Sequence, residues 1–227
     1  MKRRNPAIVL FPLAIVMALV AARPASAQAY KVEKVTLAAP AELSAPVRDI
    51  LSGDAYRVTG PNGVLCEVWV RKSAPVNAAP STDSSVAFGQ LTEGALIAAV
   101  RFPSEVVDYR SQHIKAGAYT LRYGLNPVDG NHMGVAPQRD FLLATPAAVD
   151  ADPATVTHDQ MVDLSRKTTG TKHPSVWSIA PPAAAGAMPS MSHQDDPEAW
   201  MLNFPLALDG GKSLAVSLVV WGHAPES

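Results

Sequence analysis

Short segments in which apolar and polar residues alternate constrain the fold of this chain more than any other feature. Between residues 96 and 102, Leu96, Ala98 and Val100 fall on one side of an extended backbone, and Arg101 falls on the other. This two-residue period is typical of strands with one buried face. Similar alternation occurs over 64–70, 119–123, 200–204 and 214–220, and turn-forming Gly, Pro, Asn or Asp residues occur near 60–63, 126–131 and 209–211. The pattern predicts a mostly β fold, an antiparallel β-sandwich.

A single helical segment interrupts the strands. Thr157 and Gln160 have the spacing of a capping box, in which a hydroxyl and an amide satisfy the first backbone groups of a helix. Met161 and Leu164 follow at helical spacing, so we expect both to pack on the sheet from a short surface helix over 157–168. A weaker helical pattern over 41–51 contains Pro46, which disfavours a helix there.

The first 27 residues have the three parts of a secretory signal peptide. Residues 1–7 contain three basic side chains and no acidic one, an apolar run follows over 7–22, and Ala25-Ser26-Ala27 matches a signal peptidase site. The apolar run is shorter than a membrane-spanning helix requires, and Pro12 interrupts it. We therefore predict cleavage after Ala27 and a periplasmic or secreted protein.

The remaining residues, 28–227, are predicted to form one β-sandwich domain. A stretch rich in Pro, Ala and Ser over 181–197 is expected to be a long loop. No later segment is apolar enough to span a membrane.

Charge restricts the partners of the mature chain. Four of the 19 basic residues lie in the leader, which leaves 15 basic against 20 acidic residues, a formal net charge of −5. This balance argues against nucleic acid and anionic lipid as partners, because both require a basic surface. Cys66 is the only cysteine, so no internal disulfide is possible, and its place in an apolar strand predicts a buried thiol.

Common catalytic signatures do not occur in the sequence. It contains no His-Glu-x-x-His, Gly-x-Ser-x-Gly or Ser-x-x-Lys sequence, no P-loop and no dinucleotide-binding glycine pattern. The leading interpretation is an exported, non-enzymatic binding or structural protein that needs no cofactor.

A group of methionines and histidines supports an alternative, periplasmic copper binding. Met188, Met191 and His193 lie within six residues, and His132 and Met133 lie in another turn-rich segment. Thioether sulfur prefers Cu(I), and imidazole also binds copper, so these five residues are the candidate metal ligands. The competing interpretation is that the methionines fill gaps in the core while His193 is solvated.

Tryptophans support a second alternative, a carbohydrate-binding or hydrolytic module. Exposed tryptophans on a β-sandwich can stack on sugars, and the candidates are Trp69, Trp177, Trp200 and Trp221. Trp69 lies on the strand face opposite Val68, beside Glu67 and Arg71, and is the best exposed candidate. Burial in the core is the favoured interpretation of these tryptophans.

Two short motifs carry a family resemblance. The chain contains Ile114-Lys115-Ala116-Gly117-Ala118-Tyr119-Thr120-Leu121 and, near its end, Val220-Trp221-Gly222. Together they resemble the DUF2911 family of exported bacterial proteins, whose members have an I/L-x-A-G-x-Y-x-L strand entry and a terminal Trp-Gly. The resemblance covers about half of the chain and implies an exported β fold without implying an activity. Gly117 permits a turn before the strand, after which Tyr119 and Leu121 are expected to face the core.

Overall fold

A computed structural model describes residues 30–127, 138–222 and 224. Its helices are α1 (Ala45–Ile50) and α2 (His158–Thr169). Its strands are β1 (Lys31–Thr36), β2 (Asp54–Gly60), β3 (Gly63–Val70), β4 (Leu96–Phe102), β5 (Val106–Val107), β6 (His113–Ile114), β7 (Gly117–Leu125), β8 (Asp140–Pro146), β9 (Ser175–Ala180), β10 (Ser190–Asp195), β11 (Glu198–Ala207) and β12 (Ser213–Gly222). No helix among these residues is long and apolar enough to cross a membrane.

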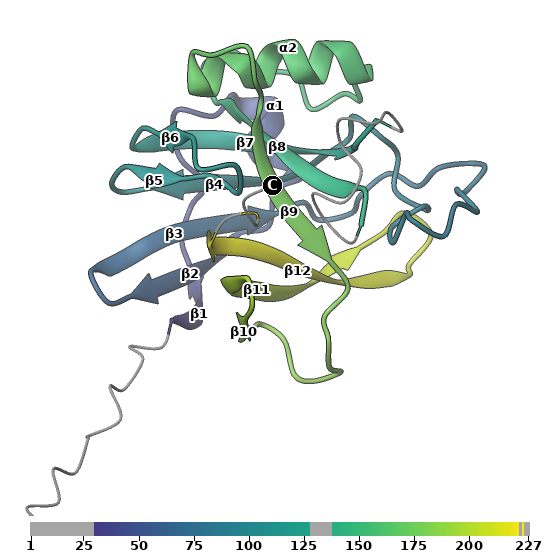
Figure 1. Cartoon of the computed structure of the whole chain (residues 1–227). Coiled ribbons are helices and arrows are strands. Elements are labelled where there is room, and N and C mark those ends of the chain that lie inside the picture. The colour runs from purple at the N-terminus through teal and green to yellow at the C-terminus, as the bar shows by residue number, and fades with distance from the viewer. Residues whose placement is uncertain (1–29, 128–137, 223, 225–227) are drawn as a thin grey trace, which may run out of the picture.

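Ten strands form one antiparallel sheet in the order β1-β2-β3-β4-β7-β8-β9-β12-β11-β10, and β5 and β6 form a separate hairpin. The mostly β, antiparallel prediction is confirmed, with 47% strand and 10% helix. Figure 1 shows the strands curving around a shared interior.

Strand β9 joins the two halves of this sheet. Its residues 175–178 pair with β8, whereas Ile179 and Ala180 pair with β12. The chain therefore turns a corner within one strand, and the sheet becomes nearly barrel-shaped. The two end strands, β1 and β10, approach each other but are not hydrogen-bonded neighbours. The sheet is therefore not closed by hydrogen bonds between β1 and β10.

The interior of the barrel is the main core. The inward residues of β3, β4, β7 and β12 pack together, and Phe102 stacks on Trp177 with ring centroids 5.1 Å apart. Cys66, Tyr119 and Leu121 are buried in this cluster, as predicted. Burying a side chain of this size contributes about 1.5–3 kcal/mol.

A second core lies outside the barrel, under α1. Trp69 is completely buried there, packs in the same cluster as Val47, and donates from Nε1 to the Leu37 carbonyl at 2.7 Å. Trp69 is therefore not available to stack on a sugar, because a helix covers the outer face of its strand, and the interpretation of Trp69 as a core residue is confirmed.

The short helix α1 also corrects the prediction of a single helix. The Ser44 side chain accepts a hydrogen bond from the Val47 amide, and Pro46 lies in the first helical turn. Proline is tolerated there because the first turn has no intrahelical acceptor for its amide.

Helix α2 agrees with its capping signal. The Thr157 side chain accepts from the Gln160 amide, and the Gln160 side chain accepts from the Thr157 amide. Met161 is buried as expected, but Leu164 is only half-buried. The second buried position is Ser165, whose Oγ donates to the Ala144 carbonyl at 2.7 Å. The helix therefore contacts the backbone of β8 through a hydrogen bond from Ser165, not through the side chain of Leu164.

The predicted long loop over 181–197 is partly wrong. Residues 190–195 form β10, which pairs with β11 along its whole length. The segment Ser-Met-Ser-His-Gln-Asp has no clear apolar alternation, so its extended conformation depends on the backbone hydrogen bonds that β11 offers.

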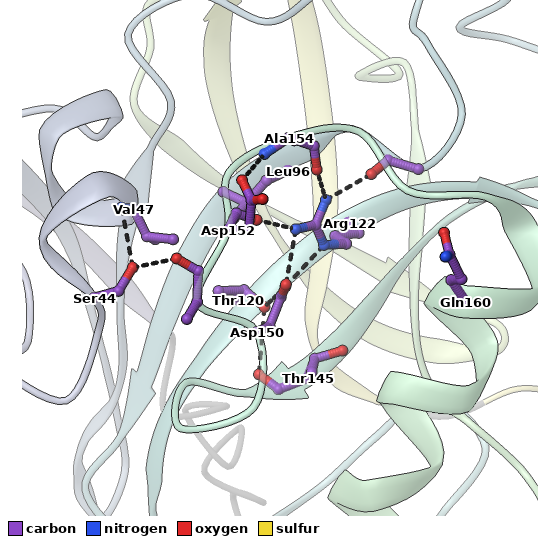
Figure 2. Close-up of polar contacts among 12 residues, drawn as sticks. Ser44, Val47, Leu96, Thr120, Arg122, Thr145, Asp150, Asp152, Ala154 and Gln160 are labelled. Atoms are coloured by element: carbon purple, nitrogen blue, oxygen red, sulfur yellow. Dashed lines mark hydrogen bonds and ion pairs between the residues drawn. The ribbon is translucent and has the colours of Figure 1, made fainter.

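A buried ion pair holds the segment that leads into α2 (Figure 2). Arg122 on β7 donates from Nε and Nη2 to the two carboxylate oxygens of Asp150, at 2.8 Å each. Its remaining N–H groups donate to the carbonyls of Gly94, Asp152 and Ala154. All five donors of the guanidinium are therefore satisfied, as a buried cation requires.

Candidate ligand-binding site

A pocket of about 320 Å³ opens at one end of the barrel, close to the start of β1. We call it the Trp221 pocket. It is lined by Tyr30, the β2–β3 hairpin at residues 60–65, residues 104–107, His113, Val220 and Trp221. These elements belong to both halves of the sheet and to the small β5–β6 hairpin, so only the folded chain assembles the pocket.

Exposed apolar side chains gather in this pocket. Five large apolar side chains are exposed among the described residues, and three of them, Val64 (36%), Val107 (39%) and Trp221 (37%), line it. Single exposed apolar residues are normal on a protein surface, but a cluster around a concave site is typical of ligand binding.

A β-bulge sets the direction of Trp221. Trp200 on β11 pairs with Trp221, whereas the next residue, Met201, pairs with Val219. Val220 is therefore an extra residue on β12, and such an insertion re-aims the side chains beside it. Val220 and Trp221 both line the pocket, although strict alternation would place them on opposite faces.

Tyr30 fixes the two tryptophans at this end of the barrel. Its ring centroid lies 5.4 Å from that of Trp200 and 5.9 Å from that of Trp221. Burial, and secondarily the charge of Glu198, raises the pKa of the Tyr30 hydroxyl. The phenol therefore stays neutral near pH 7.

The glycine after Trp221 is required by the backbone. Gly222 has φ +114°, and a Cβ at this position would lie 2.6 Å from the Glu198 carbonyl oxygen. Only glycine accommodates both conditions. The terminal Trp-Gly pair of the sequence is thus the end of the bulged strand that presents Trp221.

The polar side of the pocket contains one carboxylate–imidazole pair. His113 Nδ1 lies 2.8 Å from Glu105 Oε1, and both side chains are largely exposed. Neither lysine nor arginine occurs among the described residues that line the pocket. The described lining therefore contains one carboxylate, Glu105, and one imidazole, His113.

The wall that contains this pair is anchored by Asp108. This buried carboxylate accepts hydrogen bonds from the backbone amides of Arg110, Gln112 and Val176. The bond to Val176 connects the β5–β6 turn to β9. Burial raises the pKa of Asp108, although these donors partly oppose the shift.

The residues predicted to bind copper are only partly described. Met191 and His193 lie on the same side of β10, where Met191 packs against the main core. The His193 ring contacts Trp200 at a centroid distance of 4.5 Å. Met188 is half-buried before β10, and His132 and Met133 lie outside the described residues.

The surroundings of His193 are acidic. Its Nδ1 lies 3.4 Å from Asp195 Oδ1, and its Nε2 lies 3.7 Å from Glu198 Oε1. Within residues 30–127 and 138–222, no group of three or more His, Cys, Asp or Glu side chains is arranged to hold a metal ion. Copper binding through the methionines stays a prediction.

The Trp221 pocket combines a carboxylate–imidazole pair with an exposed aromatic side chain. Glu105 contacts His113 through Nδ1, an arrangement that would leave Nε2 for a nucleophile. However, no Ser or Thr hydroxyl in the described part of the chain forms a hydrogen bond with His113. The pocket offers an aromatic face, apolar walls and a polar rim, which are the elements of a small-molecule site.

Comparison with protein-family models, curated proteins and solved structures finds no match to this chain. The function is therefore argued from the pocket itself.

Proposed function

We propose that this chain is an exported, non-enzymatic binding protein whose ligand occupies the Trp221 pocket. The observation that supports this most directly is the presence of Val64, Val107 and Trp221, three of the five exposed large apolar side chains, around one concavity. Exposing these groups to water is unfavourable, and a ligand that covers them recovers that free energy.

The construction of the site also supports binding. The Tyr30 contacts and Gly222 hold the exposed indole in one place, and Asp108 anchors the opposite wall. A site formed in advance loses less conformational entropy when it binds. The predicted leader supports the export part of the proposal.

Binding can be tested with a neutral apolar dye, N-phenyl-1-naphthylamine, and the mature chain. We expect a saturable increase in dye fluorescence with one site, and a decrease in affinity of about tenfold or more for Trp221→Ala. Val149→Ala is the matched control, because Val149 is also exposed but does not line this pocket. Equal dye affinity in the wild type and Trp221→Ala would refute the assignment of the site.

A further inference from the structure

We propose that the ligand of the Trp221 pocket is an uncharged carbohydrate that stacks on Trp221; this inference rests on the binding function proposed above. Three properties of the pocket lead to it: a fixed aromatic face, hydrogen-bonding groups beside that face, and the sign of the nearby charge.

The aromatic face matches the apolar side of a sugar ring. A pyranose has one face covered mainly by C–H groups, which packs on the electron-rich face of an indole. Trp221 is 37% exposed, and its orientation is fixed by the bulge at Val220 and by contact with Tyr30. A flexible surface tryptophan would lose entropy on stacking, whereas this one is already ordered.

The polar groups match the hydroxyls at the edge of the ring. The Glu105 carboxylate accepts hydrogen bonds through two oxygens, and His113 at 2.8 Å holds one of them in position. Asn62 also lines the pocket and offers both a donor and an acceptor. Sugar hydroxyls donate and accept together, so they can satisfy both side chains.

The charge of the pocket disfavours acidic ligands. Its described lining contains Glu105 but no lysine or arginine, and Glu198 lies close enough to raise the pKa of Tyr30. A uronic acid, a sulfated sugar or a phosphate would place a second negative charge beside Glu105. The described lining contains no lysine or arginine to compensate that charge, and His113 already pairs with Glu105. Neutral sugars avoid this cost.

The volume limits how much of a glycan is held. About 320 Å³ lies at the lower end of the roughly 300–1,000 Å³ range of ligand pockets. The pocket therefore accommodates one or two sugar units, either a small sugar or the end of a longer chain.

The test is isothermal titration calorimetry of the mature chain with neutral tetrasaccharides of glucose, mannose, galactose and xylose, and with tetragalacturonate as the acidic counterpart. We expect at least one neutral sugar to bind and tetragalacturonate to bind at least about tenfold more weakly. Trp221→Ala should weaken neutral-sugar binding by about tenfold or more, Trp221→Phe should restore part of it, and Val149→Ala should leave it unchanged.

The Glu105→Gln variant tests the charge argument separately. Removing the carboxylate should weaken binding of the neutral sugar by about tenfold, because a charge-assisted hydrogen bond is lost. The same change should reduce the discrimination against tetragalacturonate. Circular dichroism of each variant establishes that the fold is retained.

The outcomes separate this inference from the proposed function. If no sugar binds but the dye still binds in a Trp221-dependent manner, the carbohydrate assignment is wrong and the binding function stands. If neither binds, both are wrong. Sugar binding that is insensitive to Trp221→Ala, or equal affinity for tetragalacturonate, would also overturn the inference.

Discussion

Cys66 illustrates how the interior of the barrel controls the chemistry of one residue. The thiol is buried in the main core, and burial raises its pKa to about 12. The thiolate is the reactive form of cysteine, so the native protein presents almost none of it at neutral pH.

We therefore expect Cys66 to be unreactive toward a disulfide reagent at about pH 8 in the native state and to react fully in denaturing urea.

The raised pKa of Cys66 also makes the stability of the protein depend on pH. Above about pH 8.5 the unfolded thiol ionises while the native thiol stays protonated, so the free energy of unfolding should fall as the pH rises toward 12. Rapid labelling of Cys66 in the native protein would contradict the expected low reactivity of the buried thiol.

Replacing Arg122 with an uncharged residue should strongly lower the free energy of unfolding, because it removes a buried charge. It is completely buried and pairs with Asp150, so Arg122→Met would leave a buried carboxylate without its cation. We expect a loss of about 3–5 kcal/mol in the free energy of unfolding, measured by urea denaturation. Arg166→Met, which breaks an exposed pair with Asp163, should cost less than about 1 kcal/mol. Equal costs would mean that the Asp150 carboxylate is compensated in another way.

At the scale of elements, β12 provides a direct test of which strand face is buried. Leu218 faces the core and Ala215 on the same strand is exposed. Leu218→Asp should cost several kcal/mol or prevent folding, because it places an unpaired charge in the core. Ala215→Asp should change the thermal midpoint little, and a destabilisation equal to that of Leu218→Asp would show that the assigned faces are wrong.

Helix α2 allows a similar comparison within one turn. Met161 packs against Phe141 and Leu143, whereas Leu164 is only half-buried. Met161→Ala should therefore cost about 2–5 kcal/mol, and Leu164→Ala should cost clearly less. Chemical denaturation of both variants measures the difference. A larger loss of stability for Leu164→Ala than for Met161→Ala would contradict this expectation and would support the packing of Leu164 that helical spacing predicts.

At the scale of the whole molecule, the predicted leader determines which residue begins the mature protein. Cleavage after Ala27 would begin the mature protein at Gln28, two residues before Tyr30, and would keep the tyrosine that contacts Trp200 and Trp221. N-terminal sequencing of exported protein should start at Gln28. Recovery of a chain that retains Met1 in the membrane fraction would contradict the leader prediction.

Local sequence patterns were sufficient wherever neighbouring residues decide the structure. The two-residue period over 96–102 and 214–220 predicted strands, and on β12 it predicted the buried face of Val216, Leu218 and Val220. On β4 the assignment of faces was wrong for Leu96, because a register shift after Leu96 places it in the second core with Ala99, away from Ala98 and Val100. The Thr157–Gln160 spacing predicted the start of α2. Both patterns work because side-chain direction and capping depend on residues only a few positions apart. The same reasoning did not predict what covers Trp69, because its cover comes from a separate helix.

The candidate site could not be predicted from local sequence patterns. The sequence contains the residues of the Trp221 pocket, and the terminal Trp-Gly pair was noticed, but nothing local indicates the extra residue at Val220 or the pairing of β10 with β11.

By itself, then, the sequence determined the β-rich class, the capped helix and the buried environment of Cys66, since each follows from short-range periodicity and burial. Only the tertiary structure decided that Trp69 is covered and Trp221 exposed, and that Tyr30 at one end of the described chain meets Trp221 at the other. The physical reason is that these outcomes depend on which distant strands pair and in which register. A one-residue shift in that register exchanges the inner and outer faces of a strand.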